Sequence, residues 1–388
     1  MIYPTSFLEI DAGALRENLK FLKRIAGKNR DILHVVKGNA YGHGIEQFVP
    51  LLQRLGANSF GVFDAYEAYR VKQVVHNQPR IIIMGMIDAH EIEWAIIHNI
   101  EFYVFDVYRL SKAIDLSKTI GKKAKVHIEV ETGMNRTGFE WKDRQQLIKL
   151  LENDGQFLEV KGVCTHFAGA ESIANYLRVK NQYKMFNKWT GFLDDAKVDY
   201  EQIHTACSAA AIRYPKTKMD MIRTGILQYG FWPSEETLIE YLKNKTRQRD
   251  PLRRVISWKS TVMSIKTLSK GDYVGYGTSY LASFDMVVAT VPIGYAHGFA
   301  RSLSNQGRVL IRGERTMVIG TVNMNMMVVD ITNIKNVEPG DEVVIIGHQK
   351  DQSITVSSFS DFSSQLNYEL LTRLPREIPR VVNGNGYS

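Results

Sequence analysis

A single lysine stands at the end of an apolar segment near the amino terminus. Residues 32–36 read I-L-H-V-V, a run that predicts a buried strand, and Lys37 follows directly. The next residues, G-N-A-Y-G-H-G, are rich in glycine and predict a loop. A lysine at the edge of an apolar strand loses water, which lowers the pKa of its ammonium group and favours a role as an amine nucleophile. On position alone, a solvated surface lysine is the commoner outcome.

Other polar residues follow further apolar segments of the first 230 residues. The stretch E-V-E-T-G-M-N-R-T-G contains Glu129 and Arg136, and C-T-H-F-A contains His166. Later, H-T-A-C-S-A-A contains Ser208 and M-I-R-T-G-I contains Arg223. Taken singly, these residues also fit a turn with a surface ion pair or a histidine satisfied in the core.

These residues need a scaffold that brings the ends of many segments together. Apolar segments recur at roughly 20–40-residue spacing, with helix-period segments in most of the gaps. They cover residues 32–36, 59–63, 80–84, 101–105, 124–130, 160–167, 201–206 and 221–227. The pattern predicts a parallel (β/α)8 barrel of the TIM type, whose βα loops form a site at its carboxyl face. A doubly wound open sheet is the alternative, but it favours one crevice over chemistry after many strands.

The two ends of the chain differ from this repeat. Residues 6–10 predict one short strand, after which Asp11 caps a helix. Beyond a basic run at residues 243–254, interpreted as a solvated linker, the remaining strand-like segments cover residues 255–268, 286–293, 308–311, 316–330 and 341–346. We therefore predict a barrel domain at residues 1–245 and a β-rich domain at residues 246–388.

The amino-acid composition limits the classes of protein to which this chain can belong. The 388 residues are 44% hydrophobic, so the chain can bury a large core. The formal charge is +8, but basic and acidic residues are interleaved along the chain. This pattern argues against a nucleic-acid partner. Two cysteines, Cys164 and Cys207, are too few for a disulfide framework, and no apolar stretch is long enough for a membrane helix. These features, with no secretion signal, predict a cytoplasmic protein that binds no membrane.

The stretch V-V-K-G-N-A-Y-G-H-G resembles the pyridoxal-phosphate lysine motif of the alanine racemase family. The resemblance implies that Lys37 binds pyridoxal 5'-phosphate covalently. It also implies contacts to the cofactor phosphate from Tyr41, Ser208 and Tyr368. Gly225 and Ile226 follow the last predicted barrel strand, where backbone N–H groups tend to bind a phosphate, so we expect them to complete this set.

The resemblance assigns roles to the other polar residues of the barrel. Arg136 is expected to contact the phenolic oxygen of the cofactor and the substrate carboxylate, and His166 to lie beside the cofactor ring. Arg223 is expected at the pyridine nitrogen, where related decarboxylases have a glutamate. A permanently charged guanidinium disfavours protonation of that nitrogen. Glu129 stands where many members have a carbamylated lysine, and we expect its carboxylate to hold Arg136 in the same way.

In the second domain, G-D-Y-V-G-Y-G-T-S-Y resembles the racemase loop that carries the second catalytic base, which implies that role for Tyr276. The stretch P-I-G-Y-A-H-G places Tyr295 near the substrate entrance, and V-N-M-N contains Met324, whose backbone is expected to help bind the substrate carboxylate. His297 and Asn325 depart from the family, because aspartate is usual at both positions.

Together these matches imply an amino-acid racemase, an isomerase that interconverts L- and D-alanine with Lys37 and Tyr276 as two bases. They also imply a homodimer with shared active sites. A racemase of another or broader set of amino acids is one alternative. A related barrel decarboxylase is disfavoured by Arg223, and a non-catalytic cofactor carrier by the presence of a second domain.

Overall fold

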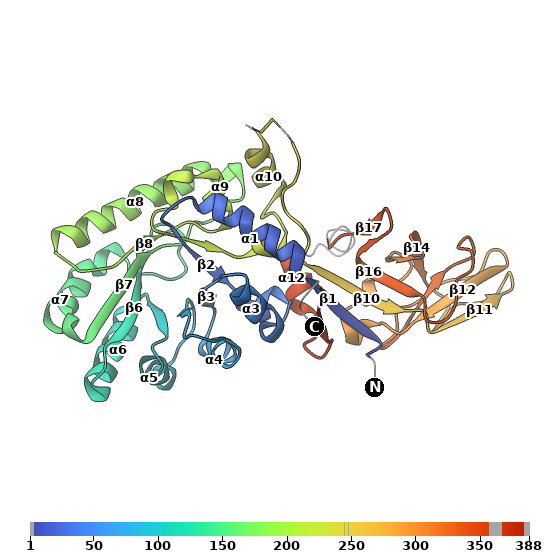
Figure 1. The fold of residues 1–388 in the computed structure, drawn as a ribbon, viewed down its shortest axis with the longest axis horizontal. Helices are drawn as coiled ribbons and strands as arrows, with labels where there is room; N and C mark the ends of the chain where they lie inside the picture. Colours follow the sequence, from blue (N-terminus) through green and yellow to red (C-terminus); the bar gives the residue numbers. More distant parts are fainter. Residues whose placement is uncertain (1–3, 244, 247, 357–366, 384–388) are drawn as a thin grey trace. The chain divides into compact units, whose positions relative to one another are not determined.

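The computed structural model describes residues 4–243, 245–246, 248–356 and 367–383. Contacts divide the chain into two compact units, both drawn in Figure 1. The barrel unit comprises Leu15–Ala40 and Val49–Arg253. The β-rich unit comprises Met1–Ala14, Tyr41–Phe48 and Arg254–Ser388.

The barrel unit is built on a parallel sheet. Its strands lie in the order β8-β7-β6-β5-β4-β3-β2-β9. Their bounds are β2 Asp31–Val35, β3 Ser59–Val62, β4 Arg80–Ile83, β5 Glu101–Val104, β6 Ala124–Glu129, β7 Leu158–Cys164, β8 Ile203–His204 and β9 Met221–Thr224. A parallel bridge between Cys207 and Arg223 joins the two ends of this order, so the sheet forms a nearly closed ring. The predicted TIM-like barrel is confirmed, and the open doubly wound sheet is wrong because β9 pairs with β2.

Helices fill the connections between these strands, and Figure 1 shows α4 to α7 on the outer side of the sheet. The helices are α1 Ala12–Ala26, α3 Ile45–Arg54, α4 Ala65–Val74, α5 Ala89–Ile97, α6 Val107–Ile120, α7 Arg144–Asp154, α8 Tyr176–Asp195, α9 Ser208–Arg213 and α10 Glu235–Leu242. Local sequence sets their ends. Asp64, Asp88 and Asp106 cap α4, α5 and α6 by accepting a hydrogen bond from the third helical N–H, and Gly121 ends α6 in the left-handed conformation.

The β-rich unit contains a sheet with the order β11-β12-β15-β14-β13-β16-β10-β1-β18, and β17 pairs with β16. Its elements are β1 Ser6–Asp11, β10 Ile256–Thr261, β11 Ser264–Leu268, β12 Met286–Val291, β13 Arg308–Ile311, β14 Glu314–Ile319, β15 Met327–Asp330, β16 Glu342–Gln349, β17 Gln352–Ile354, β18 Arg380–Asn383 and the helix α12 Asn367–Arg373. The predicted amino-terminal strand is present, and β1 pairs antiparallel with β10 and parallel with β18. The predicted cap is also present, because Asp11 Oδ1 accepts from Ala14 N at 2.9 Å.

In this unit, two segments that were each predicted as one strand form two strands apiece. The segment 255–268 divides into β10 and β11, because Val262 N donates to Asp341 O whereas Met263 N donates to Thr290 O. The chain thus leaves one neighbouring strand and joins another. The segment 316–330 divides into β14 and β15 after Gly320, whose φ of 72° turns the backbone.

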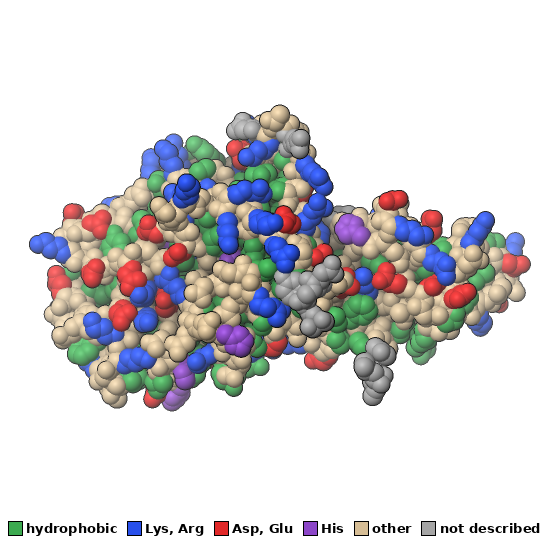
Figure 2. Space-filling view, in the orientation of Figure 1, with side chains coloured by type: hydrophobic (Ala, Val, Ile, Leu, Met, Phe, Trp, Pro, Cys, Tyr) green, Lys and Arg blue, Asp and Glu red, His purple; other side chains and the backbone are tan. Residues whose placement is uncertain are grey.

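Several further features of the described residues bear on the predictions. No helix among them is long and apolar enough to cross a membrane. Cys164 and Cys207 are both free thiols. Figure 2 shows lysine and arginine side chains interspersed with aspartate and glutamate over the barrel side of the view. The functional division into residues 1–245 and 246–388 stays a prediction.

Candidate active site

The segment that carries Lys37 has an unusual backbone. Lys37 follows β2 at the carboxyl edge of the barrel and begins α2 (Lys37–Tyr41). Its successors Gly38, Asn39 and Ala40 have φ values of 62°, 55° and 53°, which makes this a left-handed turn. For residues other than glycine this conformation costs about 1–2 kcal/mol each. Such strain persists only where the surroundings hold it, and it concentrates at functional sites.

Glu67 of helix α4 holds this turn. Its Oε1 accepts from Asn39 N at 2.9 Å, and its Oε2 accepts from Phe63 N at 3.0 Å. Arg70, one helical turn later, donates to Asn39 Oδ1 at 2.6 Å. Glu67 is buried, so both backbone N–H groups depend on its carboxylate. The strained conformation beside Lys37 is thus fixed from a regular helix.

We expect Glu67→Ala to lower the free energy of unfolding by about 2–4 kcal/mol, because two N–H groups lose their acceptor beside a strained turn. The measurement is urea unfolding followed by circular dichroism. Glu93→Ala on helix α5 is the matched control, because Glu93 is exposed and should change the free energy by about 0.5 kcal/mol or less. Equal effects of the two substitutions would show that Glu67 does not hold the turn.

The ammonium group of Lys37 lies in a cationic environment. Burial lowers its pKa, the charges of Arg136 and Arg223 lower it further, and Glu67 partly opposes them. Part of the side chain nevertheless remains exposed to solvent. The sequence-based expectation of a lysine with a lowered pKa is consistent with this geometry. A free amine is therefore easier to form at Lys37 than at an ordinary surface lysine.

Arg223 is held by acceptors on neighbouring strands and loops. Its Nη1 donates to His204 Nδ1 at 2.7 Å and to His204 O at 2.8 Å. Its Nη2 lies at 2.7 Å from Thr165 O, 3.0 Å from Thr205 O and 3.4 Å from His166 Nδ1. The guanidinium is only 6% exposed. Such a set fixes both the position and the orientation of the planar group.

His166 follows β7 and contacts Arg223. Burial lowers its pKa to about 3, and the charges of Arg223, Arg136 and Lys37 contribute further. The imidazole is therefore neutral near pH 7, and the positive charge of the pair lies on Arg223.

Ser208 and Gly225 meet at the same edge of the barrel. Ser208 begins α9, and Gly225 precedes the 3₁₀ helix η5 (Ile226–Tyr229). Gly225 N donates to Ser208 Oγ at 3.1 Å, so the hydroxyl hydrogen of Ser208 remains free to donate to an anion. Ser208, Gly225 and Ile226 are all buried. Tyr41 is half-buried at the end of the left-handed turn.

The loop after β6 differs from its prediction. The Glu131 carboxylate accepts hydrogen bonds from the backbone N–H groups of residues 133–136. Glu129 is buried, interacts with Thr137, and forms no ion pair with Arg136 among the described residues. Its Oε2 has no hydrogen-bond partner in the described part of the chain, and burial raises its pKa. Among the described residues Glu129 and Arg136 thus make no direct ion pair, since Glu129 is buried and Arg136 is exposed. The positive charge of Arg136 still acts to lower the pKa of Glu129, so only the expected direct contact is corrected.

The β-rich unit carries the other predicted residues. Tyr276 lies in the loop between β11 and β12 and is 75% exposed. Tyr295 and Met324 lie on adjacent loops, which backbone bonds from Tyr295 N to Asn323 O (3.0 Å) and from Ala296 N to Met324 O (2.9 Å) hold together. Both side chains are exposed. Tyr368 falls within helix α12, but its side chain lies outside the described residues.

Sequence reasoning missed the residues behind Arg223. His127 and His204 are fully buried and lie 2.9 Å apart through Nδ1 and Nε2. Glu101 Oε2 lies 2.7 Å from His127 Nε2. The available signal was a titratable side chain within each of three predicted strands, Glu101 in 101–105, His127 in 124–130 and His204 in 201–206. Polar groups there require partners in the barrel interior.

The comparison with known families covers most of the chain. Residues 10–233 match the family described as "Alanine racemase, N-terminal domain", and residues 255–382 match "Alanine racemase, C-terminal domain". An alanine racemase of Leptospira interrogans is 32% identical over 380 residues, which cover 97% of this chain and 96% of that protein.

Solved structures agree with this match. The alanine racemase of Bacillus anthracis with bound L-Ala-P has a TM-score of 0.89 and 31% identity, over 100% of this chain and 97% of that one. The alanine racemase of Bartonella henselae with covalently bound pyridoxal phosphate has a TM-score of 0.83 and 25% identity, over 98% of this chain and 100% of that one. The chain belongs to the alanine racemase family.

Proposed function

We propose that this chain is a pyridoxal-phosphate-dependent isomerase that interconverts L- and D-alanine with two bases, Lys37 and Tyr276. The observation that carries the proposal is the cluster at the carboxyl edge of the barrel. There Lys37, Arg136 and Arg223 influence one another electrostatically, and His166 beside Arg223 is neutral. A racemase needs such a lysine, because an ammonium group cannot accept a proton from carbon.

The residues at this edge fit the cofactor. Lys37 offers an amine that can form a covalent bond to a carbonyl carbon. The excess of positive charge from Arg136 and Arg223 is suited to anionic groups, and the Ser208 hydroxyl hydrogen beside Gly225 is free for one. We therefore assign the phosphate to the expected set Tyr41, Ser208, Gly225, Ile226 and Tyr368. Arg223, which its acceptors hold in place, would donate to the pyridine nitrogen.

When bound, pyridoxal phosphate makes the α-hydrogen of an attached amino acid acidic by accepting the electrons that the proton leaves behind. Lys37 Nζ and Tyr276 Oη then act on that hydrogen. One base removes the proton, and the other delivers a proton to the opposite side of the carbon. Two bases are required, because a single base would mostly return the proton to the side from which it came.

The remaining residues bind and orient. Arg136 binds the substrate carboxylate, together with the backbone of Met324, and Tyr295 borders the entrance. Arg223 keeps its own protons, because a guanidinium does not titrate near neutral pH. Arg223 would therefore give the pyridine nitrogen a hydrogen bond but no proton, which would restrain side reactions that need a stronger electron sink. This feature favours racemization over decarboxylation.

We further propose a homodimer in which each active site combines the Lys37 of one subunit with the Tyr276 and Met324 of the other. The large exposed surfaces of Tyr276 and Met324 support this arrangement, because such side chains are suited to burial against a partner.

The activity is tested by incubating the cofactor-loaded protein with each L-amino acid and analysing the products by chiral chromatography. We expect D-alanine to accumulate until both enantiomers are present in equal amounts. Carbon dioxide release from a basic amino acid, without any D-enantiomer, would instead identify a decarboxylase.

Subunit complementation tests the shared site. We expect a refolded equimolar mixture of the inactive Lys37→Ala and Tyr276→Phe proteins to regain about a quarter of wild-type activity, because half of the dimers are mixed and each has one intact site. If both bases belonged to one chain, every site in the mixture would carry one substitution. In that case no activity would return.

A further inference from the structure

A chain of hydrogen bonds crosses the interior of the barrel from its amino edge to Arg223. It begins at Glu101, the first residue of β5, and passes through His127 in β6 and His204 in β8. The successive distances are 2.7 Å, 2.9 Å and, from His204 Nδ1 to Arg223 Nη1, 2.7 Å. The two histidines are 0% exposed, and Glu101 and Arg223 are each 6% exposed. The two histidines therefore cannot exchange their partners for solvent.

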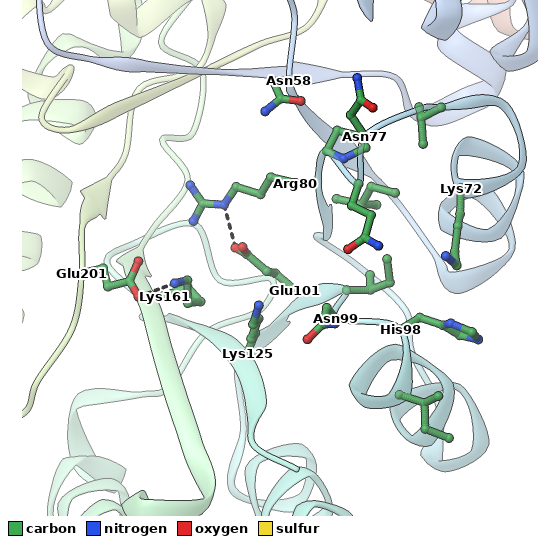
Figure 3. A pocket seen from close by; sticks show the side chains of 16 residues that line it. Asn58, Lys72, Asn77, Arg80, His98, Asn99, Glu101, Lys125, Lys161 and Glu201 are labelled. Carbon is green, nitrogen blue, oxygen red and sulfur yellow. Dashed lines mark hydrogen bonds and ion pairs between the residues drawn. The ribbon is translucent and has the colours of Figure 1, made fainter.

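The amino end of the chain is anchored separately. Arg80 Nε donates to Glu101 Oε2 at 2.8 Å, and Figure 3 shows this contact at the rim of a cavity of about 810 Å³. In the orientation that satisfies both groups, the Gln202 side-chain oxygen accepts from both terminal nitrogens of Arg80. Burial opposes the ionisation of Glu101, but His127 and Arg80 outweigh it and lower the pKa of the carboxyl group. Glu101 is thus a carboxylate, which can only accept hydrogen bonds.

The two end groups determine the direction of every bond between them. Arg223 can only donate, so His204 Nδ1 must accept, and the proton of His204 lies on Nε2. That proton points at His127 Nδ1, which must then accept, so the proton of His127 lies on Nε2 and points at Glu101. Burial lowers the pKa of both histidines, which agrees with neutral rings. One arrangement of protons satisfies all four residues.

We propose that Glu101 is a positioning residue for the racemization inferred above: by accepting from His127 it fixes the tautomers of both histidines and keeps His204 Nδ1 an acceptor for Arg223. A glutamine at position 101 could donate as well as accept. It would therefore permit the reversed chain, in which His204 presents an N–H to Arg223. The N–H groups of His204 and Arg223 would then face and repel each other. This repulsion would displace the guanidinium, and Arg223 would no longer be aligned for its hydrogen bond to the cofactor ring.

A structural role of Glu101, as a partner of Arg80 alone, makes different predictions. It would affect stability without specifying where the histidine protons lie. The proton positions are therefore the readout that separates the two roles, and they are measurable in the unaltered protein.

The first experiment is a neutron crystal structure of the deuterated, cofactor-loaded wild-type protein. We expect deuterium on Nε2 of both His127 and His204 and none on either Nδ1. Deuterium on Nδ1 of either ring would overturn the proposal. This result does not depend on whether the protein racemizes alanine. If no D-amino acid forms in any assay, the proposed function fails, while the deuterium positions still decide the tautomers.

The second experiment compares Glu101→Gln with Glu201→Gln. Glu201 lines the same cavity but is exposed and pairs with Lys161, outside the chain. We expect Glu101→Gln to lower kcat about tenfold with little change in KM, and to shift the visible absorption of the bound cofactor. Glu201→Gln should change neither. Unaltered kcat and absorption in a folded Glu101→Gln protein would overturn the positioning role, and if that variant does not fold, the wild-type deuterium positions decide.

Discussion

Lys37→Ala should lower kcat for racemization by about 10⁴-fold or more, because it removes both the covalent anchor of the cofactor and one of the two bases. The visible absorption of the lysine-bound cofactor should also disappear. Part of the Lys37 side chain is exposed to solvent, so its truncation should disturb packing less than the loss of a core side chain. The loss would therefore report on chemistry rather than on folding. Absorption spectra and a coupled D-alanine assay measure both effects.

Lys125→Ala is the matched control for this substitution. Lys125 belongs to β6 at the opposite, amino edge of the barrel, where it lines the cavity of Figure 3. We expect it to keep the absorption band and the activity. If Lys37→Ala retained a band near the wild-type position, another lysine would hold the cofactor, and the assignment of Lys37 would be wrong.

Tyr276→Phe should lower kcat in both directions by about 10²–10⁴-fold, the usual contribution of a positioned acid or base. The substitution removes one hydroxyl group from a side chain that is 75% exposed, so the fold and the cofactor absorption should be unchanged. A kcat defect with an intact absorption spectrum would separate the second base from the cofactor site.

Tyr273→Phe provides the control within the same loop. Tyr273 lies three residues earlier and is also exposed, but it has no assigned role in the reaction. It should retain wild-type kcat. Equal losses in the two variants would indicate a general effect on the loop instead of the removal of a base.

Much of the barrel was predictable because its strands are short apolar segments with polar residues directly after them. Lys37, His166 and Ser208 follow strands β2, β7 and β8, and the parallel order places them at one edge. Strand direction alone therefore gathers these residues. The same reasoning cannot place the first strand, because the pairing of β1 with β10 and β18 joins segments about 250 and 370 residues apart.

Side-chain contacts that depend on tertiary packing were not predictable. Glu67 resembles an ordinary helical glutamate in the sequence, yet it holds the strained turn after Lys37. Glu131 follows the same strand as Glu129, yet its carboxylate accepts hydrogen bonds from the backbone N–H groups of its own loop. Glu129 could not be placed either, because the length of its stem decides whether it reaches Arg136.

Hydrogen exchange by Tyr276→Phe in deuterium oxide tests the two-base proposal most directly. D-alanine and L-alanine are incubated separately with the variant, and mass spectrometry follows deuterium at the α-carbon. As the family resemblance implies, we propose that Lys37 acts on the D-enantiomer and Tyr276 on the L-enantiomer. We predict that the variant exchanges the α-hydrogen of D-alanine with solvent deuterium but barely exchanges that of L-alanine. Equal residual exchange from both enantiomers would contradict it.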